Sequence, residues 1–322
     1  MRVRKVLRIR PALLLGVGCL CAAAPATLAS AAPAGQPGPP RQEQVADIAR
    51  ADFLARLQEA LASPERDSAE ELLATLEHLM PAWQSEQRQN RAEPLENLLR
   101  LRVVTHFEIV LEAFRSGSRN RRLVAAWALG FSRVPDNELG LVSPHPLAVS
   151  ALVEALATAD DALLRNVLLG LWKIGEPGTP LRPILDLMVS HHDADVRSDA
   201  ALALCTVLQP DTAARVIDST LAALADKEPK VRLHAANIVR RFPATETTDQ
   251  LIKRLPREDT PLVRAAMAAA LGTAGRRDAA PLLVDMLGSA RQIESITARQ
   301  ALVRLFGTDR GPMPQDWESL LR

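Results

Sequence analysis

Apolar and polar positions repeat along the chain with a long period that is typical of stacked helix pairs. In the phrase that begins at Val196, apolar or small residues take the first, fifth, sixth and ninth positions, and an arginine takes the second. This spacing places them on one stripe of an α-helix. Related phrases begin at positions 121, 164, 231 and 263, and a degenerate one keeps Ala298, Ala301 and Leu302. The period predicts supersecondary units that stack along an axis.

Each unit has the same internal order. An apolar stretch with helical spacing comes first, as in residues 152–157, and a polar turn follows, as in residues 192–195. The second helix then opens near Asp226 and Pro229, residue types that suit a helix start. Adjacent small residues such as Ala235 and Ala236 are expected to be buried where neighbouring helices meet, because only small side chains allow a close approach.

The predicted fold class is all-α, a right-handed α-solenoid of about six helix hairpins over residues 103–307, with no β-sheet. An apolar stripe of Val45, Ile48, Leu54, Leu57 and Leu61 makes residues 42–102 a helical N-terminal cap. At the other end, residues 308–322 are expected to form a capping helix. Its Trp317, Leu320 and Leu321 would cover the last apolar face.

The phrases resemble HEAT repeats of the bacterial, phycobilisome-lyase-like type. The Val-Arg-x-x-Ala-Ala core at residues 196–201 and its counterpart at residues 231–236 carry the resemblance. It implies a structural arginine ladder, in which each arginine bridges to an acidic turn residue of the adjacent unit. The arginines are Arg122, Arg165, Arg197, Arg232 and Arg264, and the available acids are Asp160, Asp193, Asp226 and Asp259. An anion-binding role for the same arginines is the alternative.

The first 31 residues resemble a targeting segment. Five basic residues precede an apolar run at positions 11–24, and Ala29-Ser30-Ala31 offers a cleavage site. We therefore expect a signal peptide at residues 1–31, a Pro/Gly/Ala-rich linker at residues 32–41, and export to the periplasm or cell envelope. A lipoprotein cleavage site at Cys19 is the alternative, and it is the only membrane attachment that we expect.

Composition narrows the possible partners. The chain is 48% hydrophobic but only 3% aromatic and lacks tyrosine, which suits packed helices. Loss of the targeting segment removes five basic and no acidic residues, which takes the formal charge from +1 to −4. With no basic block in the mature chain, we expect no nucleic-acid partner.

Few residues suggest chemistry. Cys205 is the one cysteine outside the targeting segment and lies in an apolar run, so it is expected to be buried. His191, His192, Asp193 and Asp195 form a polar cluster with metal-ligand character, but turns favour such residues anyway. HEAT-repeat enzymes that hold iron do so through His-Glu dipeptides, and this chain has none. The expectation is therefore no catalytic residue, no metal and no cofactor.

These observations favour a non-enzymatic scaffold that binds a protein or peptide in the bacterial cell envelope through the groove of the array. The alternative is an accessory or lyase-like protein that handles a bound cofactor. Positions three, four and seven of each phrase point away from the buried stripe and are expected to face the groove. The candidate partner-binding residues are Leu123, Val124, Trp127, Asn166, His234 and Asn237. A second interpretation places Trp127 against the N-terminal cap.

Overall fold

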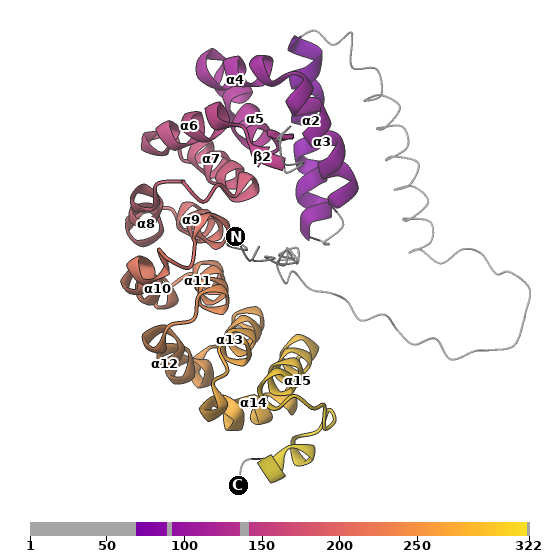
Figure 1. Cartoon of the computed structure of the whole chain (residues 1–322), viewed down its shortest axis with the longest axis vertical. Coiled ribbons are helices and arrows are strands. Elements are labelled where there is room, and N and C mark those ends of the chain that lie inside the picture. Colours follow the sequence, from indigo (N-terminus) through magenta and orange to yellow (C-terminus); the bar gives the residue numbers. More distant parts are fainter. Residues whose placement is uncertain (1–68, 89–91, 136–141, 321–322) are drawn as a thin grey trace, which may run out of the picture.

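The computed structural model describes residues 69–88, 92–135 and 142–320. Within them the chain is an array of helix pairs that curves from the N-terminal to the C-terminal end (Figure 1). The expected signal peptide, the linker, Cys19, the apolar stripe at positions 45–61 and Leu321 lie outside the described residues. None of the described helices combines the length and the apolar character that crossing a membrane requires.

Six helix pairs follow one another in the described residues, each with one outer and one inner helix (Figure 1). The pairs are α4 (Phe107–Ser116) with α5 (Arg119–Leu129), α6 (Pro146–Glu154) with α7 (Asp161–Ile174), α8 (Leu181–Ser190) with α9 (Ala194–Val207), α10 (Ile217–Leu224) with α11 (Pro229–Arg241), α12 (Thr245–Arg254) with α13 (Pro261–Thr273), and α14 (Ala280–Leu287) with α15 (Gln292–Phe306). Short 3₁₀ turns extend or precede four outer helices: η1 (Ala155–Ala157), η2 (Ala213–Val216), η3 (Leu255–Arg257) and η4 (Arg277–Ala279). The predicted all-α solenoid is confirmed.

The inner helices begin where the sequence places its capping residues. Asp160 precedes α7 and accepts hydrogen bonds from the backbone N–H groups of Ala162 and Leu163. Asp193 accepts one hydrogen bond, from the backbone N–H of Asp195, at the start of α9. Pro229 and Pro261 are the first residues of α11 and α13, where a missing N–H costs nothing. The polar turns therefore fix the start of α7 and α9 by side-chain caps, and α11 and α13 begin at a proline.

Small residues hold the inner helices close together. Ala235 and Ala236 are fully buried, as predicted. A methyl group added at Gly272 of α13 would lie 2.6 Å from the Cβ of Ala301 on α15. One added at Gly170 of α7 would lie 2.6 Å from the carbonyl oxygen of Ala126 on α5. The apolar stripe of each inner helix thus merges with its neighbours into one continuous core.

A further helix pair, α2 (Ala69–Arg88) and α3 (Glu93–Thr105), lies beside the inner layer at the N-terminal end (Figure 1). Trp83 of α2 packs against Trp127 of α5, with ring centroids 5.6 Å apart. The indole N–H of Trp83 donates to Glu96 of α3 at 3.1 Å, and Glu96 also pairs with Lys173 of α7. This pair covers the inner face of the first units.

The expectation of no β-sheet is wrong at one place. Strand β1 (Arg133–Pro135) pairs antiparallel with β2 (Val142–Pro144), and Val134 is opposite Ser143. A proline restricts the residue before it to extended conformations, and each strand ends in a proline. The connection between α5 and α6 therefore pairs as a small ribbon.

The C-terminal end also differs from the expected capping helix. It consists of two 3₁₀ turns, η5 (Pro314–Asp316) and η6 (Glu318–Leu320). Trp317 nevertheless fills the predicted place: it is fully buried, it packs against Phe306, and its indole N–H donates to the carbonyl oxygen of Gly311 at 2.9 Å. Gly311, which has a positive φ, and the prolines at positions 312 and 314 interrupt helical geometry at the start of this segment.

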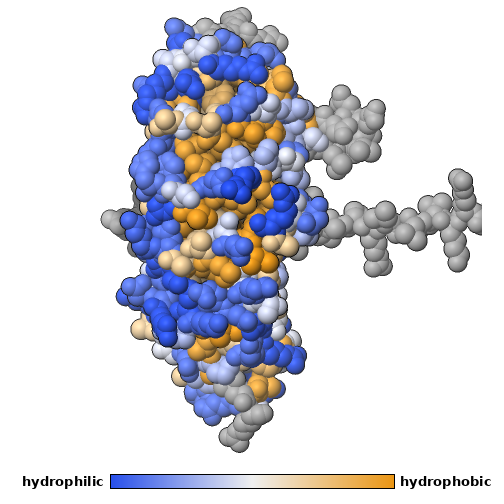
Figure 2. Space-filling view, turned by 90° about the vertical axis from the view of Figure 1, so that its left-hand side faces the viewer, coloured by the Kyte–Doolittle hydropathy of each residue, from blue (hydrophilic) through white to orange (hydrophobic). Residues whose placement is uncertain are grey.

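The outer helices form the opposite face of the array. Figure 2 shows this face, on which polar bands alternate with apolar patches. Exposed apolar side chains here include Leu147 of α6 and Val189 of α8. Single exposed apolar residues are normal on a protein surface, so we assign them no role.

Candidate functional site

The arginines in the second position of each repeat phrase lie at the start of the inner helices. Arg197 donates from Nε and Nη2 to the carboxylate of Asp226 at 2.7 and 3.0 Å. Its Nη1 donates to the backbone carbonyl oxygens of His191 and His192 at 2.9 and 3.1 Å. One side chain thus fixes its own inter-helix turn and contacts the next unit.

Arg232 repeats this arrangement one unit later. Its Nε and Nη2 donate to the carboxylate of Glu258 at 2.7 and 2.8 Å, and its Nη1 donates to the carbonyl oxygens of Asp226 and Lys227. Arg232 and Glu258 are only 9% and 7% exposed. Paired charges at this depth fix the register between units more than they add stability.

The remaining arginines correct the expected set of acidic partners. Arg165 pairs with Asp199 at 2.9 Å and with Asp195 at 3.1 Å, and Arg264 pairs with Glu294 at 3.2 Å. Arg122 donates instead to the carbonyl oxygen of Phe114. Of the four expected acids, Asp226 pairs as predicted, Asp160 pairs with Arg119, Asp193 caps α9, and Asp259 is 92% exposed and 3.8 Å from Arg232.

The pKa values of two carboxyl groups in these pairs shift in opposite directions. Burial by itself raises the pKa of Glu258, but hydrogen bonds from Arg232 and from the backbone N–H of Thr260 outweigh it and lower that pKa below its usual value. Burial raises the pKa of Asp199 to about 6 despite the opposing hydrogen bond from Arg165. The buried pair of Arg232 and Glu258 is therefore held in its charged form. The carboxyl group of Asp199, in contrast, titrates closer to neutral pH than an ordinary aspartate.

Two of the expected partner-binding residues lie in the core, which corrects their assignment. Trp127 is 1% exposed and Val124 is 6% exposed. The rings of Trp127 and Phe131 lie 5.2 Å apart in an edge-to-face contact, and Trp83 of α2 covers them. Position seven of the repeat phrase faces the groove only where no other element lies over it. Here α2 does, so the second interpretation of Trp127 describes the structure.

Three other candidates make contacts within the array. Asn166 of α7 donates from its amide to the carbonyl oxygen of Leu123 on α5 at 2.9 Å, and Leu123 is half-buried against the core. Burial lowers the pKa of His234 of α11 to about 4, and its backbone carbonyl oxygen accepts a hydrogen bond from the thiol of Cys205 on α9 at 3.8 Å. These contacts tie neighbouring inner helices together.

The sixth candidate, Asn237, lines a groove near the C-terminal end of the inner layer. Its lining includes Ala265 and Ala266 of α13, which are buried, as well as Leu233 of α11 and Ile293 of α15. Leu262 of α13 is 47% exposed. We call this surface the C-terminal groove; its lining residues are Leu233, Asn237, Leu262, Ala265, Ala266, Ile293 and Thr297.

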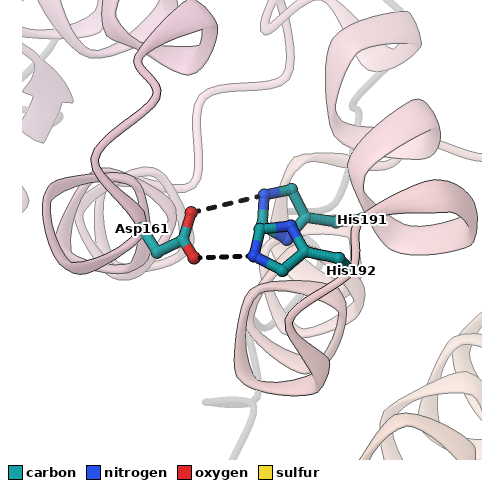
Figure 3. Close-up of side chains that lie close together, drawn as sticks. All are labelled: Asp161, His191 and His192. Atoms are coloured by element: carbon teal, nitrogen blue, oxygen red, sulfur yellow. Dashed lines mark ion pairs between the residues drawn. The ribbon is translucent and has the colours of Figure 1, made fainter.

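A polar cluster lies at the turn between α8 and α9. The Nε2 atoms of His191 and His192 approach the two carboxylate oxygens of Asp161, at 3.6 and 3.1 Å (Figure 3). The neighbours expected from the sequence face elsewhere, since Asp193 caps α9 and Asp195 pairs with Lys230 and Arg165. Asp161 is on the preceding unit, and sequence proximity could not indicate it.

Cys205 is buried, as expected. It lies on α9, and its thiol donates to the carbonyl oxygen of Ala201 at 3.4 Å. Such a position gives the thiol no open access to a ligand.

One comparison with known protein families agrees with this architecture. A family model described as HEAT repeats matches residues 217–303, which run from the start of α10 into α15. Residues 217–303 therefore match HEAT repeats, and the described residues form a repeat scaffold. A comparison with curated proteins finds no match.

Among solved structures, the chain is similar to human deoxyhypusine hydroxylase in complex with glycerol. The identity is 13%, the TM-score is 0.35, and the similarity covers 82% of this chain and 99% of the other. At this TM-score the similarity carries no argument about the fold or the reaction of this chain. It does correct the expectation of a protein without enzymatic activity, because that neighbour is an enzyme built on HEAT repeats. In general, a repeat scaffold is no ground for excluding catalysis, because one fold can host many functions.

Proposed function

We propose that this protein is an exported scaffold that binds an apolar segment of a partner protein in the C-terminal groove. The observation that carries the proposal is the half-exposed Leu262, which lines this groove together with Leu233 and Ile293. Apolar patches with adjacent polar groups are typical of interaction sites. Asn237 and Thr297 supply those polar groups. The sequence favoured an apolar binding surface around Trp127 at the N-terminal end, but α2 covers that surface. We therefore assign binding to the C-terminal groove.

The size of the expected effect follows from the groove. Complete burial of a leucine side chain is worth about 1.5–3 kcal/mol, and Leu262 has about half of its surface left to bury. A glutamate in its place would lose this gain and would also bring a charge against Ala265 and Ile293. We expect partner affinity to fall by about tenfold or more, which corresponds to about 1.4 kcal/mol.

The test compares co-purification of the partner from the native cell envelope with wild-type protein, Leu262→Glu and Leu101→Glu. Leu101 of α3 is 63% exposed and lies outside the groove, so its substitution is a matched control. We expect Leu262→Glu to lose the partner at an unchanged melting temperature, and Leu101→Glu to retain it. Retention of the partner by Leu262→Glu would reject the groove as the binding surface.

Export is the second part of the proposal. It rests on the basic, apolar and small-residue order of residues 1–31. Intact mass of the protein from its own host should show loss of these residues, or a chain that starts at a lipidated Cys19. A full-length chain recovered from the cytoplasm would contradict both forms.

The alternative of an accessory or lyase-like protein gains no support from the described residues. A bilin or haem site needs an open apolar groove with a cysteine or histidine in it. Cys205 is buried instead, and burial holds the pKa of His234 at about 4.

A further inference from the structure

We propose that Asp161, His191 and His192 bind one Zn²⁺ ion between the second and third units of the array. This site lies apart from the C-terminal groove and goes beyond the proposed function. It also replaces the expectation, drawn from the sequence, that the chain holds no metal.

The arrangement of the three side chains carries the proposal. One ligand atom from each residue can be chosen so that all three lie within 4.8 Å of one another. The Nε2–oxygen separations of 3.1 and 3.6 Å are close to those between two ligands of one zinc ion, whose bonds are about 2.0–2.2 Å long. The two imidazole rings lie 4.5 Å apart at an angle of 31°, so both present Nε2 to the same carboxylate (Figure 3).

The backbone of the ligand residues is fixed by contacts that do not involve the three ligating side chains. Arg197 holds the carbonyl oxygens of both histidines and is itself paired with Asp226. Asp161 is the first residue of α7, a helix whose start Asp160 caps. A site whose ligand-bearing turns are already positioned pays little ordering cost on binding.

The charge of the site favours a cation. Within the described part of the chain, the only ion-pair partners of Asp161 are these two histidines, whereas Asp160, Asp195 and Asp199 each pair with an arginine or lysine. Two neutral imidazoles and one carboxylate leave a net charge of −1. This donor set suits Zn²⁺ and its first-row neighbours, whereas Ca²⁺ and Mg²⁺ prefer oxygen ligands alone.

Binding changes the tautomer of His191. The Nδ1 atom of His191 accepts a hydrogen bond from the backbone N–H of Asp193 at 3.1 Å, so the neutral ring carries its proton on Nε2, toward Asp161. Coordination through Nε2 moves the ring proton to Nδ1 and ends that hydrogen bond. We therefore expect a moderate affinity, below that of sites whose histidines already donate from the second nitrogen.

The experiment uses the full chain without a polyhistidine tag. Zn²⁺ is titrated in competition with a chromogenic chelator, and Co²⁺ serves as a spectroscopic substitute. We expect one ion per chain. His192→Ala and Asp161→Asn should each weaken binding by at least about tenfold, since removal of a second-shell partner alone costs 10–100-fold at known sites. His192 is 79% exposed, and Asp161→Asn keeps the shape of the side chain, so both variants should fold.

His78→Ala is the control, because His78 is exposed on α2 and has no place in the cluster. It should bind Zn²⁺ as the wild type does. Zn²⁺ should also raise the melting temperature of the wild type and of His78→Ala but not of His192→Ala, because an ion that binds only the folded state stabilises it. Absence of a stoichiometric site, or equal affinity in wild type and His192→Ala, would overturn the proposal.

Discussion

The buried pair of Arg232 and Glu258 allows a direct test of how the repeats are held in register. In Glu258→Gln the side chain keeps its shape but loses its charge, and Arg232 stays buried with Asp259 as its nearest remaining carboxylate, at 3.8 Å. Breaking a buried pair costs about 3–5 kcal/mol. The carbonyl contacts of Arg232 survive the change, so the lower end, about 3 kcal/mol, applies. For a domain of this size each kcal/mol lowers the melting temperature by about 2–4 °C, which predicts a loss of roughly 6–12 °C.

The assay is thermal and urea unfolding followed by circular dichroism. Asp259→Asn is the matched control, since this neighbouring carboxylate is 92% exposed and its loss should cost below about 0.5 kcal/mol. The double variant Arg232→Met with Glu258→Leu should recover most of the stability, because apolar residues of similar volume often replace a buried pair without loss. Equal losses in Glu258→Gln and Asp259→Asn, or a double variant no better than the single one, would refute this reasoning.

Three further predictions concern stability. Trp127→Ala should lower the free energy of unfolding by about 3–5 kcal/mol in a urea melt, and a loss below about 1 kcal/mol would place its side chain outside the core. Gly272→Ala should cost about 1–3 kcal/mol because its new methyl group would lie 2.6 Å from the Cβ of Ala301; Gly288→Ala, whose nearest contact would be 3.5 Å away, should melt like the wild type. Burial lowers the pKa of His234 from 6.5 to about 4, so as the pH falls the unfolded chain takes up a proton at this histidine before the folded chain does. The contribution of neutral His234 to the free energy of unfolding is therefore complete above about pH 6.5 and is lost as the pH falls toward 4. Denaturant titrations across this range should show a smaller pH dependence for His234→Gln, and identical slopes would contradict the assignment.

The helix pairs could be predicted from the sequence because their signals are local. The stripe that includes Val231, Ala235 and Ala236 lies within one helix, and its burial follows from its spacing. The same spacing could not show that α2 covers Trp127, because that depends on where another element docks. The ribbon at Arg133–Pro135 has no periodic signal at all.

The candidate sites show the same limit. The repeat phrase located the arginines, but their partners depend on how far apart neighbouring units lie. Arg232 therefore pairs with Glu258 and not with the adjacent Asp259. Asp161 joins His191 and His192 across two units, and sequence proximity favoured Asp193 and Asp195 instead. Residues of three helices, α11, α13 and α15, line the C-terminal groove, so one repeat phrase could not predict it. Of the six predicted partner-binding residues, only Asn237 lines it.

The most direct test of the proposed function is photo-crosslinking in the native host, with a photoreactive residue placed at position 262 in one variant and at position 101 in the other. Both positions are exposed leucines, but only Leu262 lines the C-terminal groove. We expect a specific protein adduct from position 262 and none from position 101. The same adducts from both positions, or none from position 262, would contradict a partner-binding role for this groove.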